Sequence, residues 1–328
     1  MVKRTIAAAA LCLLTGAAWA QEENPAPAAD TEQVLIVGQR PGPGLWRVSK
    51  GDHVLYVFGD YAPLPVKMDW RSNEVESIIA KSQEFMPRPT FGITVGFWGM
   101  VKMVPLLFGL KNNPDGAKLV DVLPAETYDR WQVLKAKYIG KDNGIESERP
   151  MFAAETLYKK GLEKNGLTAS TDVYAKLYKL AKQYKLKSTS SSVEMEMDDA
   201  NQTLKAFKKS AGTDTVCFAK TVERLESDID AMRVRANAWA VGDMSKIASM
   251  NFADREEACK EAVLNNEAFK AKLQNMTGDL QAKWVANAER ALDANNTTFA
   301  VLWLHQILSP KGPLAELKAK GYKVEAPE

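Results

Sequence analysis

Short apolar runs near both ends of the chain predict β-strands. Residues 45–48 and 54–58 flank Lys50-Gly51-Asp52, a spacing typical of a β-hairpin. The run 298–304 is apolar throughout, which favours a central strand of a sheet. The sequence from 312 to the end indicates a short helix, a stop at Gly321 and a last strand.

The middle of the chain has helical spacing of its apolar residues. A helix is predicted after Ser72, which would cap it, and a short strand at 84–86 follows. Apolar residues from Phe218 to Trp239 recur every three or four positions, which predicts one amphipathic helix that Gly242 ends. Strands at both ends with helices between them predict an α/β (α+β) fold. We expect a single domain whose central mixed sheet combines N- and C-terminal strands.

The most apolar segment after the N-terminus runs from Phe91 to Leu110. Its length matches a membrane span, but Lys102 lies near its middle, and Pro105 and four glycines disfavour a helix. We expect a buried or cleft-lining segment, with peripheral membrane contact and a true span as the alternatives.

The first 20 residues have the features of a secretory signal. Lys3 and Arg4 precede an apolar centre, and Ala18-Trp19-Ala20 predicts cleavage after Ala20. The expected location is therefore periplasmic or extracellular. Residues 21–44 are predicted to be a flexible Pro/Gly-rich lead-in, and the domain should occupy 45–328.

Charge and cysteine content narrow the choice of partners. Without residues 1–20 the basic and acidic side chains are equal in number, so the net charge favours neither nucleic acid nor anionic lipid as a partner. Only Cys217 and Cys259 remain after the predicted cleavage. In an oxidising compartment such a pair usually forms a disulfide, and two buried thiols are the alternative.

Four motifs, taken in order, resemble the TraB/GumN family, which is related to the Tiki metalloproteases. "LWRVSKGDHVLYVFGDYAPLPVKMDW" resembles the family's opening hairpin and its first Gly-x-x-His turn. "SSVEM" places Glu194 on a family glutamate, and "ANAWAVGDMSKI" resembles a helix end. "TFAVLWLHQILSPKGPLAELKAKGYKVE" resembles the closing strand, the second Gly-x-x-His turn and the tail. The resemblance spans nearly all of the chain after the lead-in.

The departures from these motifs bear on function. In active relatives the two Gly-x-x-His turns and an early glutamate are thought to hold or serve a divalent metal. Such a metal needs about three ligands and an open position. The first turn here keeps Gly59 but has Ala62 in place of histidine, and Arg88 falls near the early glutamate. The second turn keeps His305 but has Leu302 instead of glycine.

The resemblance with these departures implies an inactive, cofactor-free scaffold that binds a protein or a glycan. His305 is the best candidate functional residue, although a lone histidine after a buried strand is often structural. The alternative is a metal-dependent peptidase, using an ion such as Mn, with a site rebuilt from Asp60, Glu194 and His305. A third interpretation is a role in exopolysaccharide production, with tryptophans stacking on sugars.

Other catalytic classes have less support. Only two histidines are available for a Ser-His-Asp triad, and no G-x-S-x-G motif is present. The glycines of "GQRPGPG" precede a strand instead of opening a helix, so they do not form a phosphate-binding loop.

Overall fold

The computed structural model describes residues 42–94, 96–169, 172–196, 205, 207–208, 214–248, 259 and 267–327. All of them belong to one compact unit. The predicted secretory signal and most of the lead-in lie outside the described residues. The last three residues of the lead-in, 42–44, are buried.

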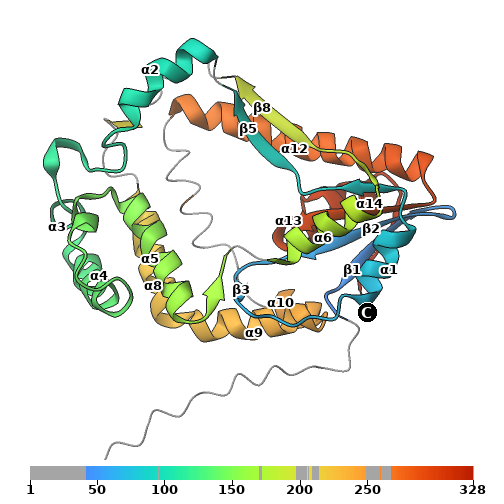
Figure 1. The fold of residues 1–328 in the computed structure, drawn as a ribbon, viewed down its shortest axis with the longest axis horizontal. Helices are drawn as coiled ribbons and strands as arrows, with labels where there is room; N and C mark the ends of the chain where they lie inside the picture. Colours follow the sequence, from blue (N-terminus) through green and yellow to red (C-terminus); the bar gives the residue numbers. More distant parts are fainter. Residues whose placement is uncertain are drawn as a thin grey trace, which may run out of the picture. The chain divides into compact units, whose positions relative to one another are not determined.

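A six-stranded mixed sheet is the centre of the domain, as predicted (Figure 1). Its strand order is β10-β1-β2-β9-β4-β7. The strands are β1 (Leu45–Lys50), β2 (His53–Asp60), β4 (Glu84–Met86), β7 (Lys187–Ser188), β9 (Thr297–Trp303) and β10 (Lys323–Glu325). The predicted hairpin is the antiparallel β1–β2 pair, and the predicted apolar strand is β9, between β2 and β4.

Three neighbouring strands of this sheet run in the same direction. β9 is parallel to β2 on one side and to β4 on the other. In the β2–β9 register, Gly59 is opposite Leu302 and Asp60 is opposite Trp303. The carboxyl ends of parallel strands meet at one edge of a sheet, where α/β proteins commonly bind ligands. The two motif turns therefore lie side by side.

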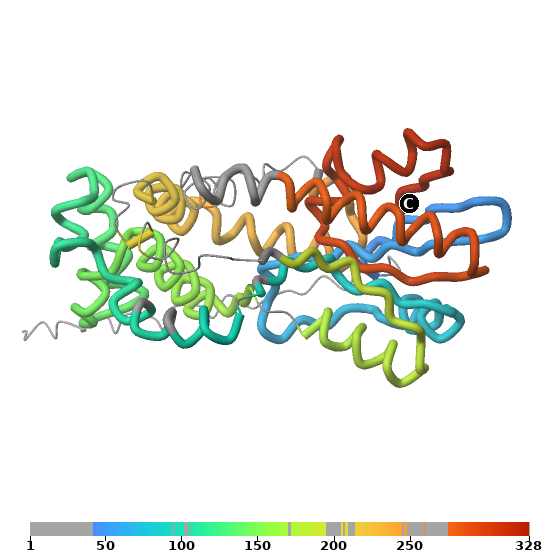
Figure 2. Tube along the Cα trace, turned by 90° about the horizontal axis from the view of Figure 1, so that it is seen from above, coloured from blue at the N-terminus to red at the C-terminus, as the bar shows by residue number. Residues whose placement is uncertain are grey.

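Helices cover both faces of the sheet (Figure 2). One face carries α1 (Asn73–Lys81) and α6 (Asp172–Gln183), and the other carries α12 (Glu267–Ala294) and α14 (Pro313–Ala319). The helix predicted after Ser72 is confirmed as α1. However, the Ser72 hydroxyl donates to the Glu76 carboxylate at 2.5 Å instead of capping a backbone amide.

Most of the other helices form a second hydrophobic core. This core includes Trp131 and Phe218, whose ring centres are 5.4 Å apart, and Cys217, which forms the predicted disulfide with Cys259. Its helices are α3 (Leu119–Val122), α4 (Ala125–Tyr138), α5 (Pro150–Lys164) and α8 (Thr215–Ser227). The remaining elements around the two cores are β3 (Leu64–Pro65), β6 (Leu167–Thr168), α9 (Ile229–Ala240), α10 (Met244–Ala248), α13 (Leu304–Leu308), and the 3-10 turns η1 (Pro114–Gly116) and η2 (Gly144–Ser147).

The single helix predicted from Phe218 to Trp239 is wrong. The chain forms α8 and α9, which are separated at Asp228, where the backbone leaves the helical conformation at φ −114° and ψ 0°. The Asp228 carboxylate is paired with both Arg224 and Arg235. The apolar spacing continues across the break, so it does not reveal it.

The expected burial of the segment from Phe91 to Leu110 is also wrong. It forms β5 (Thr90–Thr94), paired in parallel with β8 (Ser192–Glu196), and then the helix α2 (Phe97–Leu107) (Figure 1). The side chains of Phe97 and Trp98 are each 73% exposed. Among the described helices, none is long and apolar enough to cross a membrane. An apolar composition predicted burial, but β5 and β8 form a small sheet separate from the central one.

Candidate functional site

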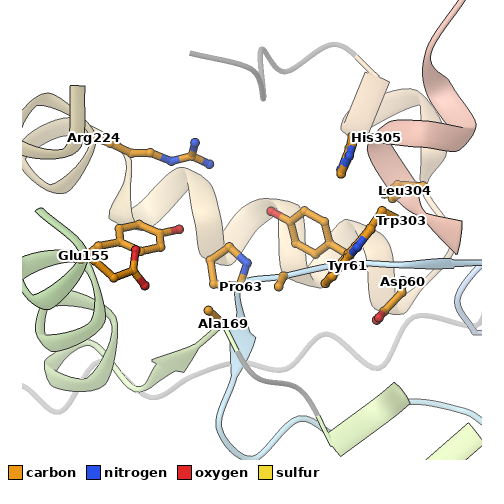
Figure 3. Close-up of a pocket in the computed structure, with 11 residues that line it drawn as sticks. Asp60, Tyr61, Pro63, Glu155, Ala169, Arg224, Trp303, Leu304 and His305 are labelled. Atoms are coloured by element: carbon orange, nitrogen blue, oxygen red, sulfur yellow. The ribbon is translucent and has the colours of Figure 1, made fainter. Parts of the chain in front are cut away.

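A pocket of about 270 Å³ lies at the carboxyl ends of β2 and β9. Residues that follow these two strands form one wall, and side chains from α5 and α8 form the other (Figure 3). The lining includes Asp60, Tyr61, Ala62, Pro63, Glu155, Tyr158, Arg224, Trp303 and His305. Both motif turns therefore contribute to a single cavity.

Asp60 is the last residue of β2, and only 1% of its surface is exposed. Arg88, which follows β4, donates a hydrogen bond from Nη1 to Oδ2 of Asp60 at 2.8 Å. Burial raises the pKa of the Asp60 carboxyl from 3.8 to about 6, although the charge of Arg88 and the backbone amide of Tyr61 act in the opposite direction. The other carboxylate oxygen, Oδ1, has no hydrogen-bond partner of normal geometry within the described residues.

Two aromatic rings hold the Arg88 guanidinium in place. Its central carbon lies 3.9 Å from the ring centre of Tyr174 on α6 and 4.2 Å from that of Trp303. Arginine binds such ring faces through cation–π attraction and planar stacking. The cation beside Asp60 is thus fixed from several sides.

The first motif turn keeps its glycine for packing. A methyl group on Gly59 would lie 2.9 Å from Leu304 Cδ1 and 3.0 Å from Trp46, so both side chains would have to move. The carbonyl oxygen of Gly59 also accepts a hydrogen bond from Trp239 Nε1 at 2.7 Å. Ala62 lines the pocket, but its methyl group has no lone pair to offer.

The second motif turn begins a short helix. Trp303 precedes α13, and its backbone N–H donates to the Gln306 side chain. The ring of His305 is stacked on that of Trp303, with 6.4 Å between ring centres and 17° between planes. His305 and Asp60 therefore line the same pocket, as the sequence hypothesis requires for two of its three residues.

Glu194 lies elsewhere, on strand β8, and its side chain is exposed. Its Oε2 accepts a hydrogen bond from Thr94 Oγ1 at 2.8 Å, and it does not belong to the lining of the pocket. In the part of the chain that the structure describes, no three His, Cys, Asp or Glu side chains are grouped so that they could hold a metal ion.

The opposite wall contributes two charged residues that the sequence reasoning missed, Glu155 and Arg224. Arg224 is paired at 3.3 Å with Asp228, which is also paired with Arg235; Asp228 and Arg235 lie outside the lining of the pocket. Arg235 also donates to the hydroxyl of Tyr61 at 3.3 Å, and burial raises the pKa of this tyrosine.

The residues present do not fit a divalent metal. A metal centre needs about three lone-pair donors directed at one point. Asp60 is instead bonded to the cation of Arg88, which would repel a dication, and Ala62 supplies no donor. Of the two motif turns, the second keeps its histidine, His305, and the first does not. The donor chemistry favours binding of a polar organic group over coordination of an ion.

Comparisons with known proteins agree with the motif pattern. A family model described as the TraB/PrgY/gumN family matches residues 44–326. Neither the curated proteins nor the solved structures give a match. The family match covers the hairpin, both motif turns and the last strand, so the chain belongs to the TraB/PrgY/gumN family.

Proposed function

We propose that this protein is an exported, catalytically inactive member of its family that binds a ligand in the pocket between the two motif turns. The observation that carries the proposal is the Arg88–Asp60 ion pair, because it engages the carboxylate that could serve as a ligand at the first turn. Ala62 strengthens the inference, since the side chain expected to supply the imidazole is a methyl group. The predicted secretory signal and the disulfide Cys217–Cys259 support export to an oxidising compartment.

The pocket favours a ligand that is polar but carries little net charge. Two charged residues of its lining are already paired with a group of opposite charge, Asp60 with Arg88 and Arg224 with Asp228. Tyr61 and Trp303 add aromatic surface with polar edges. A sugar ring combines apolar faces with hydroxyl groups, so a segment of a cell-envelope glycan matches this lining. A polar protein loop is the alternative ligand.

Measurements of metal content and peptidase activity test the proposed loss of catalytic activity. We expect the purified protein to hold no stoichiometric Mn, Co or Zn by elemental analysis, and to show no metal-stimulated cleavage of unstructured peptides. A bound metal at a one-to-one ratio would defeat the proposal. N-terminal sequencing and cell fractionation test export, for which the expected first residue is Gln21.

Glycan binding is testable by calorimetry with envelope polysaccharide fragments. Trp303→Phe retains a ring over Arg88 but removes the indole edge, so it should weaken binding. Trp98→Phe is the matched control, because Trp98 lies on α2 and does not line the pocket. Equal affinities for the two variants and the wild type would reject the pocket as the binding site.

The peptidase alternative rests on one observation, the presence of Asp60 and His305 in the same pocket. If the site is rebuilt, His305→Ala should abolish a metal-stimulated hydrolysis without lowering the melting temperature. Hydrolysis that survives this substitution would dispose of the alternative.

A further inference from the structure

The helix α2 has many apolar side chains that are exposed to the exterior. Its exposed side chains and that of the residue after it are Phe97, Trp98, Met100, Val101, Val104, Leu107 and Phe108. Phe97, Val101, Val104 and Phe108 follow one another at steps of four, three and four, so they form a stripe along one side of the helix. Phe108 is 77% exposed. Monomeric soluble proteins rarely leave such a surface in water unless it has an interaction partner.

The apolar surface extends over more than one face of α2. Successive helical residues point about 100° apart, so Trp98 projects well away from the stripe that begins at Phe97. A groove on a partner protein covers one face of a helix, whereas lipid acyl chains surround it. A helix that is apolar on most sides is typical of a lipid environment or a protein interior.

The described residues in and around α2 carry more positive than negative charges. The sequence from 91 to 113 contains two lysines and no acidic residue. Lys208 donates a hydrogen bond from Nζ to the carbonyl oxygen of Phe108 at 2.6 Å, which places a cation at the C-terminal end of the helix. The neighbouring strand β8 carries two acidic residues, Glu194 and Glu196, and the Glu194 carboxylate accepts a hydrogen bond from Thr94. Basic residues beside an apolar helix favour the anionic headgroups of a membrane surface.

From these observations we propose that α2 inserts into the surface of an anionic lipid bilayer and lies in the plane of the headgroups. An 11-residue helix is about 16 Å long, and the hydrocarbon core is about 30 Å thick, so α2 anchors the protein without spanning the membrane. The inserted side chains are those of the stripe and Trp98. The proposal does not depend on what the pocket binds.

Vesicle flotation tests the proposal. The gene product as processed by the expressing cell is mixed with vesicles of phosphatidylcholine alone, or of phosphatidylcholine and phosphatidylglycerol in equal parts. We expect binding to the mixed vesicles and much weaker binding to the neutral ones. Phe97→Ser with Phe108→Ser should lower the partition coefficient by at least about tenfold, because two large apolar side chains no longer enter the bilayer. Lys208→Gln should reduce the preference for phosphatidylglycerol.

The matched control replaces two exposed valines on other helices, Val133 of α4 and Val216 of α8, with serine. This variant should bind as the wild type does. Brominated lipids should quench the protein fluorescence, and Trp98→Phe should remove most of that quenching.

Three results would overturn the proposal. The first is that the protein binds neither kind of vesicle. The second is that the valine control loses as much vesicle binding as the double phenylalanine variant. The third is that the protein does not bind vesicles but forms a dimer in solution, which the double phenylalanine variant abolishes. The last result would assign α2 to contact between two copies of the chain.

Discussion

Asp60 and Trp303 are opposite each other in the β2–β9 ladder, and Arg88 contacts both of their side chains. Arg88 comes from a third strand of the same parallel set, since it follows β4. The ends of three adjacent strands thus assemble a carboxylate, a guanidinium and an indole. The Arg88 guanidinium pairs with the Asp60 carboxylate inside the pocket wall, and its positive charge disfavours binding of a metal ion there.

Arg88→Gln should destabilise the protein, and the effect should depend on pH. Removing one partner of a buried pair costs about 3 kcal/mol or more, because the remaining charge has no compensation. We expect a loss of about 3 kcal/mol in the free energy of unfolding at pH 8. The loss should be smaller at pH 5, where Asp60 is largely protonated, since its pKa is about 6. Urea denaturation at both pH values measures this.

Arg47→Gln, on the exposed side of β1, is the control and should have little effect at either pH. Combining Arg88→Gln with Asp60→Asn should recover much of the stability, because no buried charge is then left. An equal loss at pH 5 and pH 8 would contradict the assigned ion pair.

The raised pKa of Asp60 predicts a specific pH dependence of stability. In the unfolded chain this carboxyl loses its proton near pH 3.8, whereas in the folded protein it keeps the proton until about pH 6. Between these values the folded state binds more protons, so the free energy of unfolding should fall as the pH rises. Asp60→Asn should remove this contribution. Thermal unfolding of both proteins from pH 3.5 to pH 7 gives the difference, and parallel curves would disprove the assignment.

Glu84 should act in the opposite direction at lower pH. It is 1% exposed, and burial disfavours its charge, but hydrogen bonds from Arg290, Thr189 and Asn295 outweigh this and lower its pKa from 4.5 to about 2. The stability that its ionised form contributes should be complete above pH 4.5 and lost as the pH falls towards 2.

Glu84→Gln should therefore destabilise the protein at pH 6 and have a smaller effect near pH 2.5. Acid titration followed by circular dichroism measures both effects. Glu74→Gln, exposed on α1, is the comparison, and it should leave the acid transition unchanged. If Glu84→Gln also leaves the transition unchanged, its network does not stabilise the fold.

Reduction of the disulfide should destabilise the second core. The bond joins residues 42 positions apart, and a loop of this size restricts the unfolded chain by about 4 kcal/mol in the chain-entropy model. We expect the free energy of unfolding, measured by urea denaturation, to fall by a similar amount when a phosphine reductant is added or when alanine replaces both Cys217 and Cys259. A midpoint that reductant does not change would indicate that the cysteines are not paired in solution.

Sequence patterns predicted the parts of the fold that local physics determines. The short apolar runs of β1 and β2, the longer apolar run of β9 and the spacing in α1 each indicate burial of neighbouring residues along one element. Boundaries shifted by one or two residues, as between the predicted strand 298–304 and the observed Thr297–Trp303. The break at Asp228 was missed because periodicity does not register one non-helical residue.

The candidate site was harder to predict because its contacts are long-range. Asp60 and Arg88 are 28 residues apart, and neither belongs to a motif that predicts contact with the other. A signal was nevertheless present, since Arg88 follows the predicted strand 84–86 and Asp60 ends another. What the sequence lacked was the placement of β9 between these two strands. The exposure of α2 could not be inferred from the sequence either, because an apolar composition does not distinguish a segment buried in the domain from one exposed on its surface.

Gly59 bears on how relatives of this protein are classified. Leu304 and Trp46 leave no room for a side chain at this position, and its carbonyl oxygen accepts a hydrogen bond from the Trp239 indole; neither contact depends on catalysis. A family member without catalytic activity still has to fold, so selection for folding would keep the glycine even where the histidine of the turn is replaced. A glycine at this turn is thus evidence of shared ancestry, whereas the residue three places further on has to be inspected before any activity is assigned.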